Sequence, residues 1–122
     1  MSKYLFIAMG GAFGAVLRFF ISTMLNQAAT GSFPWGTLAV NLIGSFVLAF
    51  LVALTGGEQN AWYFFLAVGL LGAFTTFSTF SVETFTLINT LGLWMGVLNM
   101  AANLIGGLGL ALGGYALGNI IK

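Results

Sequence analysis

The sequence contains no cysteine, no histidine and no aspartate, and it contains a single proline. The absence of cysteine and histidine excludes disulfides, thiolate chemistry, haem attachment and zinc sites of the usual ligand type. Charge is also scarce, because only 4% of the 122 residues are charged: Lys3, Arg18, Lys122, Glu58 and Glu83. Soluble globular proteins carry about 25% charged residues. An ordinary soluble fold is therefore excluded, and a net charge of +1 leaves no basic surface for binding nucleic acid.

Hydrophobic residues make up 60% of the chain and form four long apolar stretches. A membrane-spanning helix needs about 20 mostly apolar residues. The stretches predict an all-α membrane protein with four spans, near residues 4–25, 35–54, 61–87 and 93–121. Trp35, Trp62 and Trp94 lie next to predicted boundaries, at the level where amphipathic rings meet the lipid headgroups. We expect residues 1–122 to form a single four-helix transmembrane domain, with the first stretch kept as a span rather than cleaved as a signal peptide.

Cations that would orient the chain in a membrane are almost absent. Four spans put Lys3 and Lys122 on one side, and Arg18 lies toward the opposite end of the first span. Lysine and arginine in short loops normally fix the orientation of a membrane protein. A chain with so little bias can insert both ways, and two opposed copies would pair about a twofold axis in the membrane plane. We therefore expect an antiparallel, dual-topology homodimer.

Small residues recur at four-residue spacing in the first and last spans. Such pairs allow helix backbones to come into close contact in lipid. The pairs are Gly10 and Gly14, Ala102 and Gly106, Gly109 and Gly113, and Gly114 and Gly118. Tight packing is the simplest interpretation of these residues.

Polar residues inside the spans form two stripes. Thr37, Asn41 and Ser45 recur every four residues in the second span, and Asn99 and Asn103 share a helix face in the fourth. Each stripe is explained equally well by hydrogen bonds between helices or by a narrow wet path whose amide and hydroxyl hydrogens bind an anion. The two interpretations stay open at this point.

The third span contains hydroxyls and aromatic rings where a lipid-facing helix would contain leucine and valine. Gly72 with the β-branched pair Thr75 and Thr76 predicts a broken helix at mid-depth. Carbonyls freed at such a break can bind a cation, and the N-terminus of the following half-helix favours an anion. Phe77 and Phe80 stand three residues apart, so their electropositive ring edges can face one small anion, although core packing explains such a pair as well.

Three motifs occur in the first three spans, in this order: Gly10-Gly11-x-x-Gly14-Ala15-x-x-Arg18-Phe19, then Gly36-Thr37-Leu38-x-Val40-Asn41, then Gly69-x-x-Gly72-x-x-Thr75-Thr76-Phe77-Ser78-Thr79-Phe80-Ser81-x-Glu83. These motifs resemble those of the small fluoride channels of the Fluc or CrcB family. The resemblance implies a passive, fluoride-selective channel in the inner (plasma) membrane that exports fluoride from the cytoplasm and lowers its toxicity. It also implies an antiparallel dimer with two pores and one central sodium ion.

The resemblance implies roles for individual residues. Phe77 and Phe80 would present ring edges to fluoride, and Asn41 would donate an amide hydrogen to it. Backbone oxygens of Gly72 and Thr75 would bind the sodium ion. The remaining implied positions are Ser78 and Thr79 in the polar track, Arg18 at the vestibule, and Glu83 near a pore entrance.

The fourth span departs from the commonest family pattern, which has a tyrosine and a serine four residues apart. Asn99 and Asn103 occupy those places and are the expected polar residues of that pore wall. Some relatives assemble from two different subunits, so a heterodimer with a paralogous subunit remains an alternative to the homodimer.

Three other classes of protein are less consistent with the sequence. A small proton-coupled multidrug exporter has a similar length and span count, but its chemistry needs a carboxylate in the first span, where this chain has Arg18. Glu83 is the only acidic residue inside a predicted span. A purely structural membrane subunit would leave the polar stripes unexplained. An enzyme is the least consistent class, because the sequence provides no set of nucleophile, base and orienting group.

Overall fold

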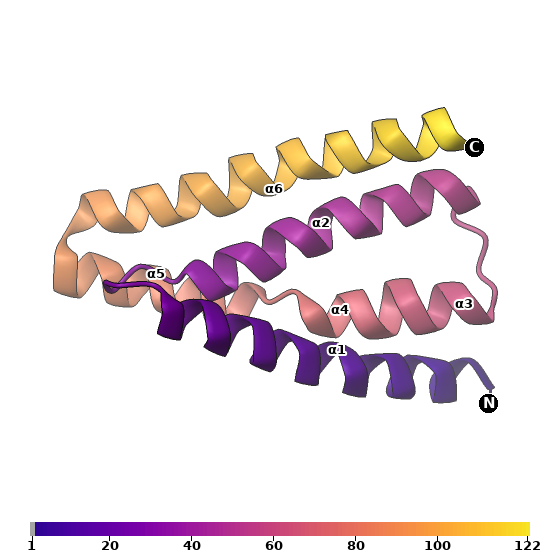
Figure 1. The fold of residues 1–122 in the computed structure, drawn as a ribbon, viewed down its shortest axis with the longest axis horizontal. Coiled ribbons are helices and arrows are strands. Elements are labelled where there is room, and N and C mark those ends of the chain that lie inside the picture. The colour runs from indigo at the N-terminus through magenta and orange to yellow at the C-terminus, as the bar shows by residue number, and fades with distance from the viewer. Residues whose placement is uncertain (1) are drawn as a thin grey trace.

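The computed structural model describes residues 2–122, and this part of the chain is helical apart from short connections. Four helical segments are long and apolar enough to cross a membrane, Ser2–Ala28, Trp35–Thr55, Ala61–Leu91 and Leu93–Ile121. The predictions of an all-α fold and of four spans are thus confirmed. The two ends of the chain lie at the same end of the bundle, as an even number of crossings requires (Figure 1).

The first, second and last spans are continuous helices: α1 (Ser2–Ala28), α2 (Trp35–Thr55) and α6 (Leu93–Ile121). Helix α2 begins directly after Pro34, which occupies the N-cap position with φ of −81° and ψ of 68°. It ends at Gly56, which adopts a left-handed conformation with φ of 65° that only glycine adopts readily. The sharp turn into α6 is made at Gly92 for the same reason, with φ of 97°.

The third span is divided into two half-helices. Its first half contains α3 (Ala61–Tyr63), a π-helical segment η1 (Phe64–Leu71) and α4 (Gly72–Phe74), and its second half is α5 (Phe77–Leu91). Between them Thr75 and Thr76 adopt extended backbone, with ψ of 157° and 117°. The predicted broken helix is confirmed, and α5 continues past the expected end of the span near residue 87.

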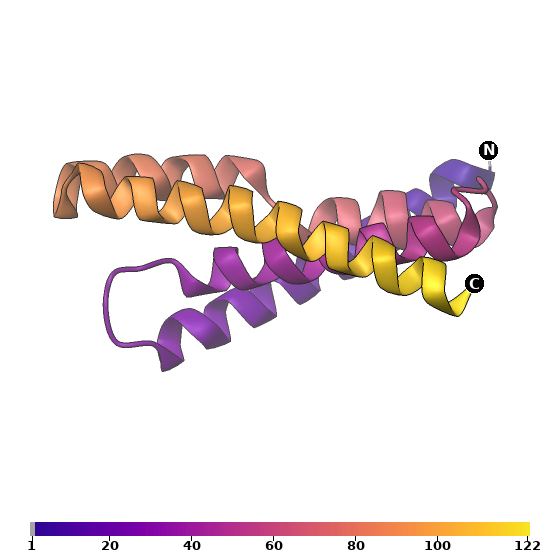
Figure 2. The same cartoon turned by 90° about the horizontal axis from the view of Figure 1, so that it is seen from above.

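Two pairs of helices make up most of the bundle. Helix α6 packs along α2, α1 packs along η1, and α5 extends beside the first half of α6 (Figures 1 and 2). A small apolar core lies where the pairs meet, next to the helix break, and contains Val40, Leu71 and Phe74. The break is therefore held by buried packing on one side, as non-helical backbone inside a membrane requires.

Glycines permit the closest of these contacts. A Cβ atom added to Gly14 would lie 2.1 Å from the backbone oxygen of Leu70, and one added to Gly114 would lie 2.2 Å from that of Phe46. The close approach predicted from small-residue spacing is therefore observed for the pair Gly10 and Gly14 and for the pair Gly114 and Gly118. A Cβ atom on Gly109 would meet nothing within 4 Å among the described residues, so no close approach depends on that glycine in this part of the chain.

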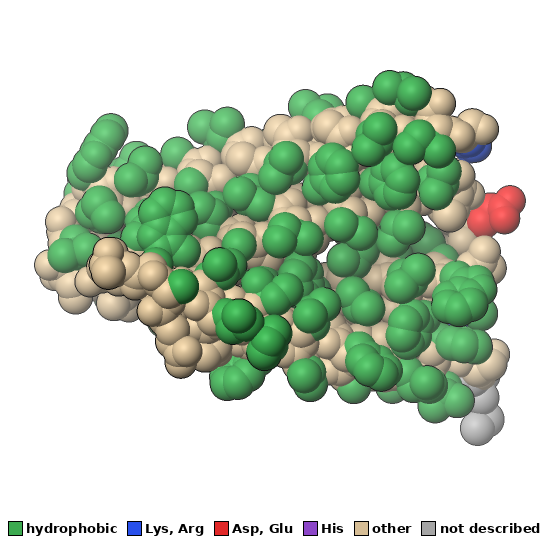
Figure 3. Space-filling view, in the orientation of Figure 1, with side chains coloured by type: hydrophobic (Ala, Val, Ile, Leu, Met, Phe, Trp, Pro, Cys, Tyr) green, Lys and Arg blue, Asp and Glu red, His purple; other side chains and the backbone are tan. Residues whose placement is uncertain are grey.

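The outer surface of the bundle is apolar. Hydrophobic side chains cover the face drawn in Figure 3, and the charged side chains visible there lie at one end. Large residues such as Phe19, Trp62 and Ile105 are more than 70% exposed. Exposed apolar patches of this extent mark contact with lipid or protein. This surface suits a multi-pass membrane protein.

Candidate functional site

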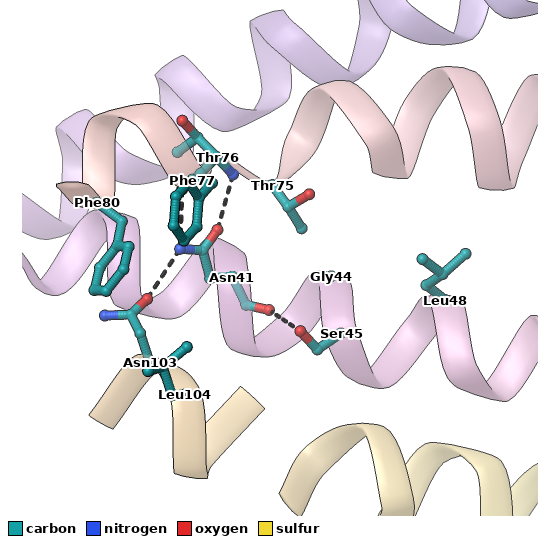
Figure 4. Close-up of a pocket in the computed structure, with 10 residues that line it drawn as sticks. All are labelled: Asn41, Gly44, Ser45, Leu48, Thr75, Thr76, Phe77, Phe80, Asn103 and Leu104. Atoms are coloured by element: carbon teal, nitrogen blue, oxygen red, sulfur yellow. Dashed lines mark hydrogen bonds between the residues drawn. The ribbon is translucent and has the colours of Figure 1, made fainter. Parts of the chain in front are cut away.

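A cavity of about 260 Å³ lies beside the helix break. Its walls come from α2, the break, the first turn of α5 and the middle of α6 (Figure 4). The residues that line it are Asn41, Gly44, Ser45, Leu48, Thr75, Thr76, Phe77, Phe80, Asn103 and Leu104. The cavity thus brings together predicted site residues from three different spans.

Asn41 joins α2 to the break by a double hydrogen bond. The backbone N–H of Thr76 donates to Asn41 Oδ1 at 2.8 Å, and Asn41 Nδ2 donates to the Thr76 carbonyl oxygen at 3.2 Å. The Asn41 side chain therefore satisfies both backbone groups of a residue that has left the helix, which unpaired would be costly inside a membrane. Thr76 in turn caps α5, because its hydroxyl accepts from the backbone N–H of Thr79 at 3.3 Å.

A chain of side-chain hydrogen bonds continues from Asn41 through α6 and returns to α5. Asn41 Nδ2 donates to Asn103 Oδ1 at 2.9 Å, and Asn103 Nδ2 donates to Asn99 Oδ1 at 3.1 Å. Asn99 Nδ2 then donates to the hydroxyl of Thr84 at 2.9 Å. The Thr84 hydroxyl donates to the carbonyl oxygen of Phe80 at 2.8 Å. We name these four side chains, Asn41, Asn103, Asn99 and Thr84, the amide chain.

The two polar stripes are thus bonded to each other as well as lining a cavity. Asn99 is fully buried, and Asn103 is 9% exposed. Ser45 donates to the Asn41 carbonyl oxygen at 2.7 Å and stays on its own helix. The structure shows the hydrogen bonding between helices and places Asn41, Ser45 and Asn103 in the cavity wall, and a wet path that binds an anion stays a prediction.

Phe77 and Phe80 form a tilted pair on the first turn of α5. Their ring centroids are 5.6 Å apart, and the rings make an angle of 55°. Phe80 is 6% exposed, whereas Phe77 is 74% exposed and contributes to the open side of the cavity. The Phe80 ring is therefore buried within this chain, and the Phe77 ring is left largely uncovered by it.

Arg18 lies at the carbonyl end of the first half-helix. Its Nε donates to the carbonyl oxygen of Ala73 at 3.0 Å. A cation at this position is favourable, because the last carbonyls of a helix carry partial negative charge and lack partners within the helix. Hydrogen bonds outside the regular helices include none to the carbonyl oxygens of Gly72 or Thr75 within residues 2–122.

Glu83 lies two turns along α5 from the break. Its Oε1 accepts from the hydroxyl of Thr37 at 2.8 Å, and its Oε2 is buried without a hydrogen-bond partner within the described residues. A second cavity of about 290 Å³ adjoins Glu83 and the connection between α1 and α2. Glu83 thus faces an opening at the end of the bundle.

The structure places the other predicted residues around the cavity rather than in its wall. Ser78 and Thr79 follow Phe77 on α5, where Thr79 accepts a hydrogen bond from the Thr76 hydroxyl at 3.0 Å. Asn99 lies behind Asn103, outside the set of lining residues. Sequence analysis missed Thr84, which closes the amide chain and is 7% exposed. Its position one turn after Phe80 was visible, but its contact with Asn99 depends on how α5 and α6 pack.

A sequence profile described as "CrcB-like protein, Camphor Resistance (CrcB)" matches residues 5–115. A protein of Opitutus terrae named "Fluoride-specific ion channel FluC" is 42% identical over 98% of this chain and 92% of its own length. A protein of the same name from Thermus thermophilus is 40% identical over 99% of this chain and 98% of its own length. Another of that name, from Shewanella woodyi, is 47% identical over 85% of this chain and 86% of its own length.

These similarities extend across all four spans, and they include the helix break and the residues that surround it. The multidrug exporter matched this chain only in length and span count, whereas these relatives match it in sequence over most of its length. By its sequence and by its four apolar helices, the chain belongs to the CrcB-like protein family.

Proposed function

We propose that the protein is a fluoride-selective ion channel of the inner (plasma) membrane that exports fluoride passively and so lowers its toxicity. The observation that carries this function is the cavity beside the helix break, where Asn41 and the two phenylalanine rings meet. The three relatives are named fluoride-specific ion channels. The protein is a channel rather than an enzyme.

The lining of the cavity suits a small, strongly hydrated anion. A selective pore must replace water around the ion without holding the ion so strongly that it cannot leave. Neutral amides and hydroxyls provide dipoles of the required kind, and aromatic ring edges add a weak positive potential. Asn41, Phe77, Phe80 and Asn103 form the proposed path in the wall of the cavity, and Ser78, Thr79 and Asn99 support it.

Efflux from liposomes tests this function directly. Vesicles that contain the purified protein are loaded with fluoride or chloride, and an ionophore dissipates the membrane potential. The channel is expected to release fluoride rapidly and chloride at the rate of protein-free vesicles. Release of both ions would contradict selectivity, and release of neither would contradict a homomeric channel.

The aromatic pair gives a prediction for the path itself. Replacing Phe77 or Phe80 by isoleucine keeps an apolar side chain but removes the ring edge, which contributes about 0.5–1.5 kcal/mol in contacts of this type. Fluoride efflux is expected to fall roughly three- to tenfold in each variant, with the oligomeric state unchanged on gel filtration. Phe85→Ile is the matched control, because Phe85 is 69% exposed on α5 and lies outside the cavity wall. Normal flux in both variants would remove the rings from the mechanism.

We extend the proposal to an antiparallel homodimer, with a heterodimer of paralogous subunits as the alternative. Support comes from the open cavity beside the exposed Phe77 ring, the exposed Gly72 at the break, and the scarcity of orienting charge. Labelling single-cysteine variants at Lys3 from each side of the membrane tests the orientation. Two equal populations are expected, and a single orientation would contradict the proposal.

The same proposal assigns a structural sodium ion to the backbone oxygens of Gly72 and Thr75. Unwound carbonyls at half-helix ends suit this ion, and among residues 2–122 these two oxygens accept none of the backbone hydrogen bonds found outside the helices. Bound sodium would link the carbonyl ends of two broken helices, which stabilises the dimer. A ligand present at 100 times its dissociation constant stabilises its bound state by about 2.7 kcal/mol.

Removal of sodium is therefore expected to weaken the dimer. Subunits labelled with a donor and an acceptor dye are diluted into lipid, and energy transfer between them is followed as N-methylglucamine replaces sodium. We expect less transfer without sodium and recovery when it returns. Equal transfer in both media would exclude a structural sodium ion at the dimer centre.

A further inference from the structure

Every polar side chain that lines the cavity has already used its hydrogen-bond donors within the chain. Ser45 and Thr75 donate to carbonyl oxygens of their own helices, and Thr76 donates to Thr79. Both amide hydrogens of Asn41 are engaged, and so are both of Asn103, which meet the backbone and side-chain oxygens of Asn99. An anion that enters this cavity therefore finds no free donor among the polar side chains of its wall, and it can take a side-chain hydrogen only by replacing an existing hydrogen bond.

The direction of the amide chain is fixed at both ends by backbone groups. The N–H of Thr76 can only donate, so the Asn41 atom that faces it is the oxygen. Asn41 then turns its nitrogen toward Asn103, so the Asn103 atom that accepts this hydrogen bond must be the oxygen. The same logic passes through Asn99 to Thr84, whose hydroxyl ends at the Phe80 carbonyl oxygen. Each amide therefore has a determined orientation rather than an interchangeable one.

Asn103 consequently presents an acceptor toward the cavity and not a donor. Its oxygen accepts from Asn41 Nδ2 at 2.9 Å. Figure 4 draws this bond as a dashed line between the two side chains. An anion is also an acceptor, so it competes with Asn103 Oδ1 for the same amide hydrogen. The second amide hydrogen of Asn41 is less available to the anion. It belongs to the pair of hydrogen bonds with Thr76 that satisfies the backbone groups at the helix break.

We infer that the Asn41–Asn103 hydrogen bond competes with the transported anion, which makes Asn103 a positioning residue that sets anion affinity through Asn41. When the anion arrives, Asn103 Oδ1 gives up the Asn41 hydrogen, and when the anion leaves, the bond re-forms. This exchange keeps the affinity low enough for release. The inference rests on the proposed function as an anion channel.

The substitution Asn103→Leu tests the exchange, because it removes the competing oxygen and keeps a side chain of similar size. The exchanged bond is an ordinary neutral one, whose loss corresponds to about a three- to tenfold change in equilibrium. The fluoride concentration for half-maximal efflux is expected to fall by that factor. The maximal rate is expected to fall as well, because a more tightly held ion leaves more slowly. Asn89→Leu is the matched control, since Asn89 is exposed on α5 and donates only to the Phe85 carbonyl oxygen.

The opposite result has a distinct meaning. If Asn103 donated directly to the ion, its loss would raise the half-saturating concentration, and a merely structural role would lower the maximal rate without moving that concentration. Either outcome overturns the inference while leaving the channel function intact. Absence of fluoride flux in the unsubstituted protein overturns the proposed function and the inference with it.

If the Asn103→Leu variant fails to assemble, a measurement on the unsubstituted protein tests the same inference. Side-chain amide signals of ¹⁵N-labelled protein in detergent are followed by nuclear magnetic resonance as fluoride is added. The signals of Asn41 and Asn103 are expected to shift together over the same fluoride range, with chloride causing no shift. A shift of Asn41 while Asn103 stays unchanged would overturn the inference.

Discussion

Replacing Asn41 by aspartate is expected to reduce fluoride efflux about a thousandfold. The carboxylate still accepts from the N–H of Thr76, so the helix break keeps one of its bonds. It loses both amide hydrogens and turns an acceptor toward Asn103 Oδ1, which is itself an acceptor. Two like charges 4 Å apart repel by about 4 kcal/mol at an effective dielectric constant of ~20, and this corresponds to roughly three powers of ten. The liposome efflux assay measures the loss.

The matched control for this charge is Asn89→Asp. Asn89 is an exposed residue of α5, and its side-chain amide donates to the Phe85 carbonyl oxygen of the same helix. Efflux from Asn89→Asp is expected to match the unsubstituted protein. Asn41→Asp protein that assembles correctly and conducts normally would place Asn41 outside the ion path.

Replacing Gly14 by alanine is expected to lower the free energy of unfolding by about 3 kcal/mol, the upper part of the range for overpacking. The added Cβ would lie 2.1 Å from the Leu70 carbonyl oxygen and 2.9 Å from the Leu70 carbonyl carbon. Both atoms belong to the backbone, so no side chain can move aside. Helix α1 and η1 must separate, and the apolar core next to the break loses its packing. The midpoint of unfolding by sodium dodecyl sulfate in mixed micelles measures the effect.

Gly11→Ala provides a control on the same helix. A Cβ atom at Gly11 would have its nearest neighbour, the Gly69 carbonyl oxygen, at 3.9 Å, which is an ordinary contact. Alanine is a better helix former than glycine by up to about 1 kcal/mol. The Gly11→Ala midpoint is therefore expected to stay unchanged or rise. Equal midpoints for the two variants would show that the close approach of α1 and η1 is not under steric control.

The helix break links these two predictions. Gly14 brings α1 against the half-helix that ends at the break, and Arg18, one turn later, donates to the Ala73 carbonyl oxygen. Three residues after Ala73, the backbone N–H and carbonyl oxygen of Thr76 are satisfied by the side chain of Asn41 from α2. The break is thus held by a cation on its carbonyl end and by an amide on its extended backbone. Loss of either support is expected to disturb the cavity as well as the fold.

Local properties of the chain were enough to predict much of the architecture. Apolar runs of span length, with tryptophans at their ends, predict four membrane helices. The hydropathy of a run is the sum over its own residues, so it can be read without knowing the fold. The break was predicted from Gly72 and the threonine pair, since β-branched residues and glycine both disfavour helix. Close approach at Gly14 and Gly114 followed from small-residue spacing. Family motifs identified Asn41, Phe77 and Phe80 as candidate residues.

Contacts between distant residues were beyond this kind of reasoning. The bonds of Asn41 reach partners 35 and 62 residues away, so they exist only once α2, α5 and α6 pack together. Sequence spacing treats Phe77 and Phe80 alike, yet one ring is buried and the other exposed, because α6 covers only one side of α5. Thr84 joins the amide chain by the same packing. The orientation of each amide follows from the backbone groups at the two ends of that chain, and those groups meet the side chains only in the folded protein.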